Sequence, residues 1–89
     1  MNEFTLTGRV KKIEKLPNWF EVTINCHRYI STFENAESDD NFVIKTASTN
    51  KDIVECNIGD IFYAKGVLVS ENNRVILVAR KAFAIKQIV

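Results

Sequence analysis

Hydrophobic and polar residues alternate along most of the chain, which is the two-residue period of a β-strand. From Phe4 to Val10 the apolar residues occupy even positions and the polar ones occupy odd positions, apart from Gly8. Ile13 breaks this series, so the phase must change after Val10. The pattern predicts a long first strand with a β-bulge at Lys11–Lys12, a feature that bends strands in small barrels.

Four further segments show the same period and predict strands. They begin at Trp19, Phe42, Ile61 and Arg74, and they are separated by turn-forming residues at 16–18 and 71–73 and by a loop at 34–41. We expect the third strand to run from Phe42 to Ser48, the fourth from Ile61 to Val69, and the fifth to reach Ile85.

One short segment does not fit a strand. Thr49 and Asp52 have the spacing of a helix capping box, Ile53 and Cys56 offer an apolar side, and Gly59 can end a helix. These signals predict a helix of about two turns between the third and fourth strands. The expected order, three strands, a helix and two strands, is that of an all-β, five-stranded OB-fold barrel, formed by residues 1–89 as a single domain.

Charge is unevenly distributed along the 89 residues. The formal net charge is +1, but residues 34–40 hold four acidic residues and no basic ones, which leaves twelve basic against seven acidic residues elsewhere. Local fields decide electrostatic attraction, so a basic body with one acidic loop is compatible with a phosphate-binding face.

The two cysteines and the single histidine do not predict catalysis. Cys26 and His27 are adjacent on a predicted strand, so their side chains point to opposite faces and cannot share a metal or form a nucleophile pair. Asp39–Asp40 reads as a solvated turn rather than a carboxylate pair. We therefore expect no enzyme activity, no metal and no cofactor. With no signal-like N-terminus and no apolar run that could span a bilayer, we expect a cytoplasmic chain with both thiols free and no membrane partner.

The outward face of the second strand is the most informative feature. Its inner phase is apolar, yet Trp19, His27 and Tyr29 lie on the outer phase, and Phe33 continues it. OB folds bind oligonucleotides over strands two and three, and unpaired bases stack on aromatic rings. The candidate nucleic-acid-binding residues, aromatic rings and nearby cations, are Trp19, Tyr29, Phe33, Lys45, Arg9, Lys12, Arg28 and Arg74.

Each candidate has a structural alternative. Trp19 could cap the barrel, Tyr29 and Phe33 could pack beneath the acidic loop, and Lys45 could be merely solvated. Phe42 shares the phase of Ile44, which predicts a core position, with stacking on a base as the alternative.

Two segments resemble bacterial single-stranded DNA-binding proteins. Residues 4–10, with Gly8-Arg9 inside an apolar strand, look like that family's opening strand, and residues 58–68 look like its Gly-Asp segment after the helix. We expect no counterpart of the family's acidic C-terminal tail after Ile85, so the chain is more similar to the primosomal replication protein N branch, or to small relatives on phages and mobile elements. The resemblance implies single-stranded DNA binding in replication or repair.

Two other functions remain open. The predicted fourth and fifth strands are apolar on both faces, which favours a homodimer or docking onto a larger replication protein. The chain could then be an interaction subunit that supports a DNA polymerase, primase or helicase. RNA binding is the third possibility, because the fold alone does not choose among these functions.

Overall fold

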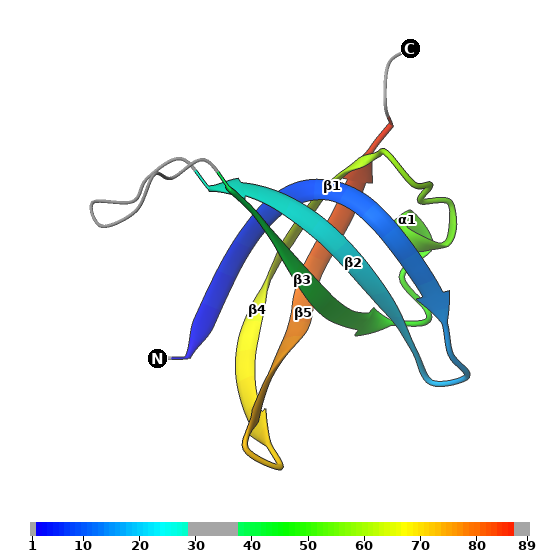
Figure 1. The fold of residues 1–89 in the computed structure, drawn as a ribbon. Coiled ribbons are helices and arrows are strands. Elements are labelled where there is room, and N and C mark those ends of the chain that lie inside the picture. The colour runs from blue at the N-terminus through cyan, green and yellow to red at the C-terminus, as the bar shows by residue number, and fades with distance from the viewer. Residues whose placement is uncertain (1, 29–37, 87–89) are drawn as a thin grey trace.

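Five strands form a closed β-barrel in the computed structural model, which describes residues 2–28 and 38–86. The strands follow one another around the barrel in the order β1-β2-β3-β5-β4 (Figure 1). Neighbouring strands are antiparallel except β3 and β5, which are parallel. The strands are β1 (Glu3–Lys15), β2 (Trp19–Arg28), β3 (Ser38–Ala47), β4 (Ile61–Glu71) and β5 (Arg74–Ile85). The predicted five-stranded all-β barrel is confirmed.

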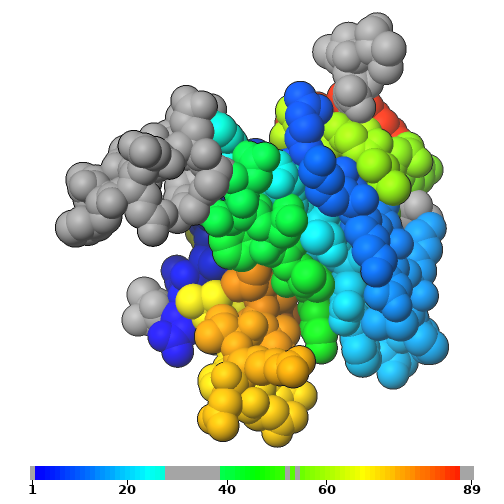
Figure 2. All heavy atoms as spheres, viewed as in Figure 1, coloured from blue at the N-terminus to red at the C-terminus, as the bar shows by residue number. Residues whose placement is uncertain are grey.

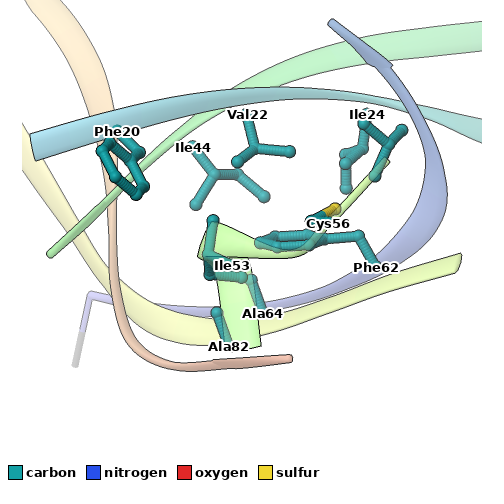
Figure 3. Close-up of a cluster of buried hydrophobic side chains, with 10 residues drawn as sticks. Phe20, Val22, Ile24, Ile44, Ile53, Cys56, Phe62, Ala64 and Ala82 are labelled. Atoms are coloured by element: carbon teal, nitrogen blue, oxygen red, sulfur yellow. The ribbon is translucent and has the colours of Figure 1, made fainter. Parts of the chain in front are cut away.

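The core forms from the even positions of β2 and their partners across the barrel. Val22, Ile24 and Phe62 are fully buried, and Ile53 closes one end from the segment after β3 (Figure 3). Burying such a side chain contributes about 1.5–3 kcal/mol. Because successive strand residues point to opposite faces, this core fixes the odd positions of β2 on the outside. Phe42 is partly buried and packs against the core, as its phase predicts.

The long first strand bends where its pairing with β2 changes register. The shift lies between Val10 and Lys12, which confirms the predicted bulge. The turn before β4 is fastened to this point: Val10 N–H donates to the Asp60 carbonyl oxygen at 2.9 Å, and Gly59 N–H donates to that of Val10 at 2.9 Å. Gly59 has a φ of 95°, so its conformation serves this turn rather than the end of a helix.

The predicted helix of about two turns is wrong in length. Between β3 and β4 the chain forms one helical turn, α1 (Lys51–Val54). The residue before this turn is Asn50, not Thr49, and its Nδ2 donates to the Ala82 carbonyl oxygen of β5 at 3.2 Å. That tertiary contact, with Ile53 in the core, holds a turn too short to be stable alone.

Two strand boundaries extend beyond the predictions. β3 begins at Ser38 rather than Phe42, because Asp39, Asp40 and Asn41 pair with β2. β4 continues to Glu71, where Asn72 and Asn73, both with positive φ, make the two-residue turn of a β-hairpin. This hairpin end extends away from the rest of the barrel (Figures 1 and 2). No helix among the described residues is long and apolar enough to cross a membrane.

Candidate nucleic-acid interface

The outer side of β2 and β3 forms a ribbon of directly opposed side chains, which we call the β2–β3 face. Each pair joins one odd position of β2 to one of β3. From one end of the ribbon to the other, the pairs are Trp19 with Ala47, Glu21 with Lys45, Thr23 with Val43, Asn25 with Asn41, and His27 with Asp39.

Trp19, Glu21 and Lys45 make one cluster at the first end of this face. The Lys45 Nζ lies 4.7 Å from the centre of the Trp19 ring, which is a cation–π contact. The Trp19 Nε1 donates to Glu21 Oε2 at 3.1 Å. The indole is therefore held by a carboxylate at its edge and a lysine over its face. The structure thus brings together two of the predicted residues, Trp19 and Lys45.

The other end of the β2–β3 face is polar. Asn25 donates to Asn41 at 3.0 Å, and the His27 Nδ1 lies 3.1 Å from Asp39 Oδ1. The prediction that Asp39–Asp40 forms a loop turn is therefore wrong, because both residues belong to β3 and pair across to β2. The cross-strand amide and imidazole contacts accompany this part of the ladder.

A shallow hollow of about 310 Å³ adjoins this polar end. It is lined by Thr7, Gly8 and Arg9 of β1, by Asn25 and His27 of β2, and by Ile61 of β4. The Arg9 Nη1 donates to the Gly59 carbonyl oxygen at 3.0 Å, so the guanidinium is tethered beside the hollow. A hollow of this size, with a cation at its edge, can accommodate a planar polar group.

The remaining predicted residues are spread over the molecule. Lys12 is exposed on β1 opposite Thr23. Arg74 is exposed at the end of the β4–β5 hairpin, far from Trp19 in the sequence. It lines a second hollow of about 400 Å³ together with Glu71, Asn72 and Ile76. Arg28 ends β2, but its side chain, together with all of Tyr29 and Phe33, lies outside the described residues.

Both cysteines are free thiols. Burial, and secondly the negative charge of Asp40, raises the pKa of Cys26 above its ordinary value. Burial, and secondly Asp60, also raises the pKa of Cys56, although Lys86 opposes this. The thiolate forms are therefore disfavoured in the folded chain. In residues 2–28 and 38–86 there is no group of three or more His, Cys, Asp or Glu that could hold a metal ion.

The sequence analysis predicted an apolar outer side for β4 and β5, but it did not identify the aromatic pair and the two lysines that lie there. Tyr63 and Phe83 stack with their ring centres 4.9 Å apart and their planes at 26°. Lys65 and Lys81 oppose each other directly in the adjoining row. One signal was available: residues 61–70 and 74–85 contain no Asp or Glu.

Comparison with known proteins identifies the fold. The barrel is similar to a small single-stranded DNA-binding protein from Mycoplasma pneumoniae, with a TM-score of 0.69, 18% identity, and coverage of 100% of this chain and 99% of that one. It is also similar to the dimeric N-terminal domain of PriB from Thermoanaerobacter tencongensis, with a TM-score of 0.64, 18% identity, and coverage of 97% and 98%.

A third similar structure is the Plasmodium falciparum SSB in complex with single-stranded DNA, with a TM-score of 0.60, 20% identity, and coverage of 96% of this chain and 93% of that chain. No family model and no curated protein sequence matches the chain. At these identities the likeness establishes an OB-type barrel.

Proposed function

We propose that this chain binds single-stranded DNA, with little sequence preference, through its β2–β3 face. The observation that carries the proposal is the Trp19–Lys45 pair, an aromatic ring and a cation side by side on the outside of the two strands that OB folds use for oligonucleotides. The named functions of the structural neighbours add support, because two of them are single-stranded DNA-binding proteins.

The chemistry follows from the arrangement of this cluster. An unpaired base stacks on the Trp19 ring, and each such contact contributes about 1–3 kcal/mol without regard to base identity. In the free protein Lys45 covers one face of that ring. When a base takes this place, the flexible lysine turns to the adjacent phosphate and exchanges a cation–π contact for a charge-assisted hydrogen bond.

The other predicted cations complete the path. Arg9 at the hollow and Lys12 on β1 lie beside the β2–β3 face and would contact phosphates next to it. Arg28, Tyr29 and Phe33 would extend it beyond the described residues. Arg74 would meet the strand where the β4–β5 hairpin projects.

Titration of the only tryptophan with oligonucleotides tests this function, because Trp19 fluorescence reports the site itself. We expect oligo-dT to quench this fluorescence, less strongly as the salt concentration rises, and a matched duplex to quench it less. Titration with an RNA strand of the same length shows which nucleic acid the chain prefers. With a labelled oligonucleotide, Trp19→Ala should weaken binding about 5- to 100-fold and Lys45→Ala about 3-fold.

Lys51→Ala serves as the control, since this exposed lysine lies in α1 rather than on the β2–β3 face. It should leave the affinity close to that of the unchanged chain. Equal affinity for Trp19→Ala, Lys45→Ala and the control would remove the β2–β3 face from the site.

We further propose that the chain pairs with a second copy through the end of the β4–β5 hairpin. Val75 is 69% exposed and Val69 is 39% exposed there, and a similar PriB domain is described as dimeric. Sedimentation of the unchanged chain should give a dimer and that of Val75→Lys a monomer. A monomer in both cases favours the second function, in which these side chains dock onto a polymerase, primase or helicase.

A further inference from the structure

Two adjoining rows of side chains on the outer side of β4 and β5, among the several rows that these strands form there, make a surface that we call the β4–β5 face. In one row Thr7 of β1 lies opposite Tyr63, which lies opposite Phe83. In the next row Thr5 lies opposite Lys65, which lies opposite Lys81. A stacked aromatic pair therefore adjoins a pair of lysines on one exposed sheet surface.

The lysine pair is unfavourable for the isolated fold. Like charges directly opposite each other on neighbouring strands are destabilising. Both lysines are exposed, and among the described residues neither forms an ion pair. The nearest carboxylate in this register is that of Glu3, one row further along opposite Val67. A ligand that carries negative charge would relieve this repulsion.

The chemistry around the lysines restricts the ligand. Aromatic rings beside cations fit a strand of nucleic acid, whose bases stack and whose phosphates pair with ammonium groups. A second copy docked face to face would collect the lysines of both copies in one contact, which opposes dimerisation here. An acidic peptide would pair with the lysines but leave the Tyr63–Phe83 stack without a partner.

The hollow over β1 connects the two faces. On one side, Asn25 and His27 belong to the β2–β3 face. On the other side, Ile61 of β4 lies in the row next to that of Tyr63. Thr7 also lines the hollow and lies opposite Tyr63 itself. The surface is thus continuous from Trp19, along β2, across β1 and onto β4 and β5.

From this continuity and from the unpaired lysines, we propose that the β4–β5 face is a second contact for the same DNA strand. The strand crosses the hollow over β1 and places bases on the Tyr63–Phe83 pair and phosphates at Lys65 and Lys81. This inference rests on the proposed function, since it extends the path that begins at Trp19.

Oligonucleotide length separates the two contacts. An oligo-dT of about 5 nucleotides is short enough to occupy the β2–β3 face alone, whereas one of about 16 can reach both, as single OB folds cover about 4–16 nucleotides. We expect Lys65→Ala/Lys81→Ala to bind the short strand like the unchanged chain but to bind the long strand about 10-fold more weakly. The slope of log K against log salt should fall by about 1.4 with the long strand, because each phosphate contact contributes about 0.7.

Lys51→Ala/Lys86→Ala is the matched control, since it removes two exposed lysines, one in α1 and one just after β5. It should keep the preference for the long strand. Phe83→Leu should weaken long-strand binding about 5-fold through the loss of stacking, with the salt slope unchanged.

Three results would overturn the inference: a double variant that matches its control, a double variant that changes sedimentation rather than DNA affinity, or equal competition by polyglutamate at this face. Each of these would leave short-strand binding, and so the proposed function, intact. Loss of the proposed function has a different signature, namely short-strand binding that is absent or insensitive to Trp19→Ala.

Discussion

The β2–β3 and β4–β5 faces are built from the same kind of antiparallel ribbon but treat charge in opposite ways. Strands β2 and β3 contain two basic and three acidic residues, whereas β4 and β5 contain four basic residues and one acidic. On the first face Lys45, Asn25 and His27 all have partners across the ribbon or beside it. On the second face Lys65 lies opposite Lys81 and the uncharged Thr5, and neither lysine has an ion-pair partner among the described residues.

The difference separates two requirements of DNA binding. The β2–β3 face holds the Trp19 ring in a defined position, and Lys45 is already in contact with that ring before any ligand arrives. The β4–β5 face keeps its cations available, and their mutual repulsion lowers the stability of the unliganded chain. A barrel that uses both faces can position a strand with one and attract it with the other.

Glycine substitutions should have the largest effects, because glycine permits the close strand contacts beneath each face. A Cβ at Gly66 would overlap the Val78 carbonyl oxygen and lie 2.8 Å from the Ala79 Cα. We expect Gly66→Ala to lower the free energy of unfolding by about 3 kcal/mol. A Cβ at Gly8 would lie 2.5 Å from the Asn25 carbonyl oxygen, and we expect Gly8→Ala to lower the free energy of unfolding by about 1–2 kcal/mol. Urea unfolding measures both.

Ser70→Ala is the control for Gly66→Ala, since Ser70 is exposed in the same hairpin. It should change the unfolding free energy by less than about 0.5 kcal/mol. A Gly66→Ala midpoint as high as that of Ser70→Ala would contradict the close approach of β4 and β5.

Removing one of the two carboxylates of the β2–β3 face, that of Glu21, should make this face more like the β4–β5 face. Glu21 holds the Trp19 indole and lies opposite Lys45. In Glu21→Gln one negative charge leaves the surface that phosphates must approach, so we expect oligo-dT to bind about 3-fold more tightly at low salt. Anisotropy of a labelled oligonucleotide measures this, and weaker binding would mean that Glu21 positions the ring for stacking.

Reversing one charge on the β4–β5 face should separate stability from binding. Lys81→Glu converts a like-charge pair into an opposite-charge pair, so the unfolding free energy should rise by about 0.5 kcal/mol while long oligo-dT binds more weakly. Lys45→Glu, which places a carboxylate opposite Glu21, should instead lower stability. Thermal unfolding of the two variants tests the contrast, and a fall in stability for Lys81→Glu would refute the cost assigned to the lysine pair.

The smallest effect should appear in the titration of Cys26. Burial and Asp40 raise its pKa above 9.0 in the folded chain, so the stability that this thiol contributes is present below about pH 9 and lost as the pH rises through the folded value. Asp40→Asn should lower the pKa part of the way towards 9.0, because burial remains. Alkylation rates against pH, followed by mass spectrometry of the Cys26 peptide, report the change, and an unmoved profile would mean that Asp40 does not act on the thiol.

Local pattern was sufficient for the barrel but not for the surface chemistry. The period of two, the break at Ile13 and the two asparagines at 72–73 predict strands, a bulge and a hairpin, and the structure has all three. The length of α1 could not be predicted, because the Asn50 bond to Ala82 joins residues far apart in sequence.

The surface depends on register, which the pattern does not specify. Trp19 was predicted on the outer side from its phase, but its contacts with Glu21 and Lys45 require the pairing of β2 with β3. Likewise, Tyr63 and Phe83 become a stacked pair only through the antiparallel register of β4 and β5. That register shifts between Lys65 and Gly66, which lie between the hairpin turn and this pair. The roles assigned to the site residues remain predictions.

The short parallel contact between β3 and β5 affects where the barrel can open locally. Within the described residues the two strands are in register at only two positions, Ile44 with Leu77 and Lys45 with Val78, whereas every other neighbouring pair is joined along a longer ladder. Local unfolding of a barrel needs the least free energy between the strands that share the fewest contacts. We therefore expect this barrel to open first between β3 and β5. Lys45 lies at this contact, so we expect a ligand bound at Lys45 to change how often β3 and β5 separate.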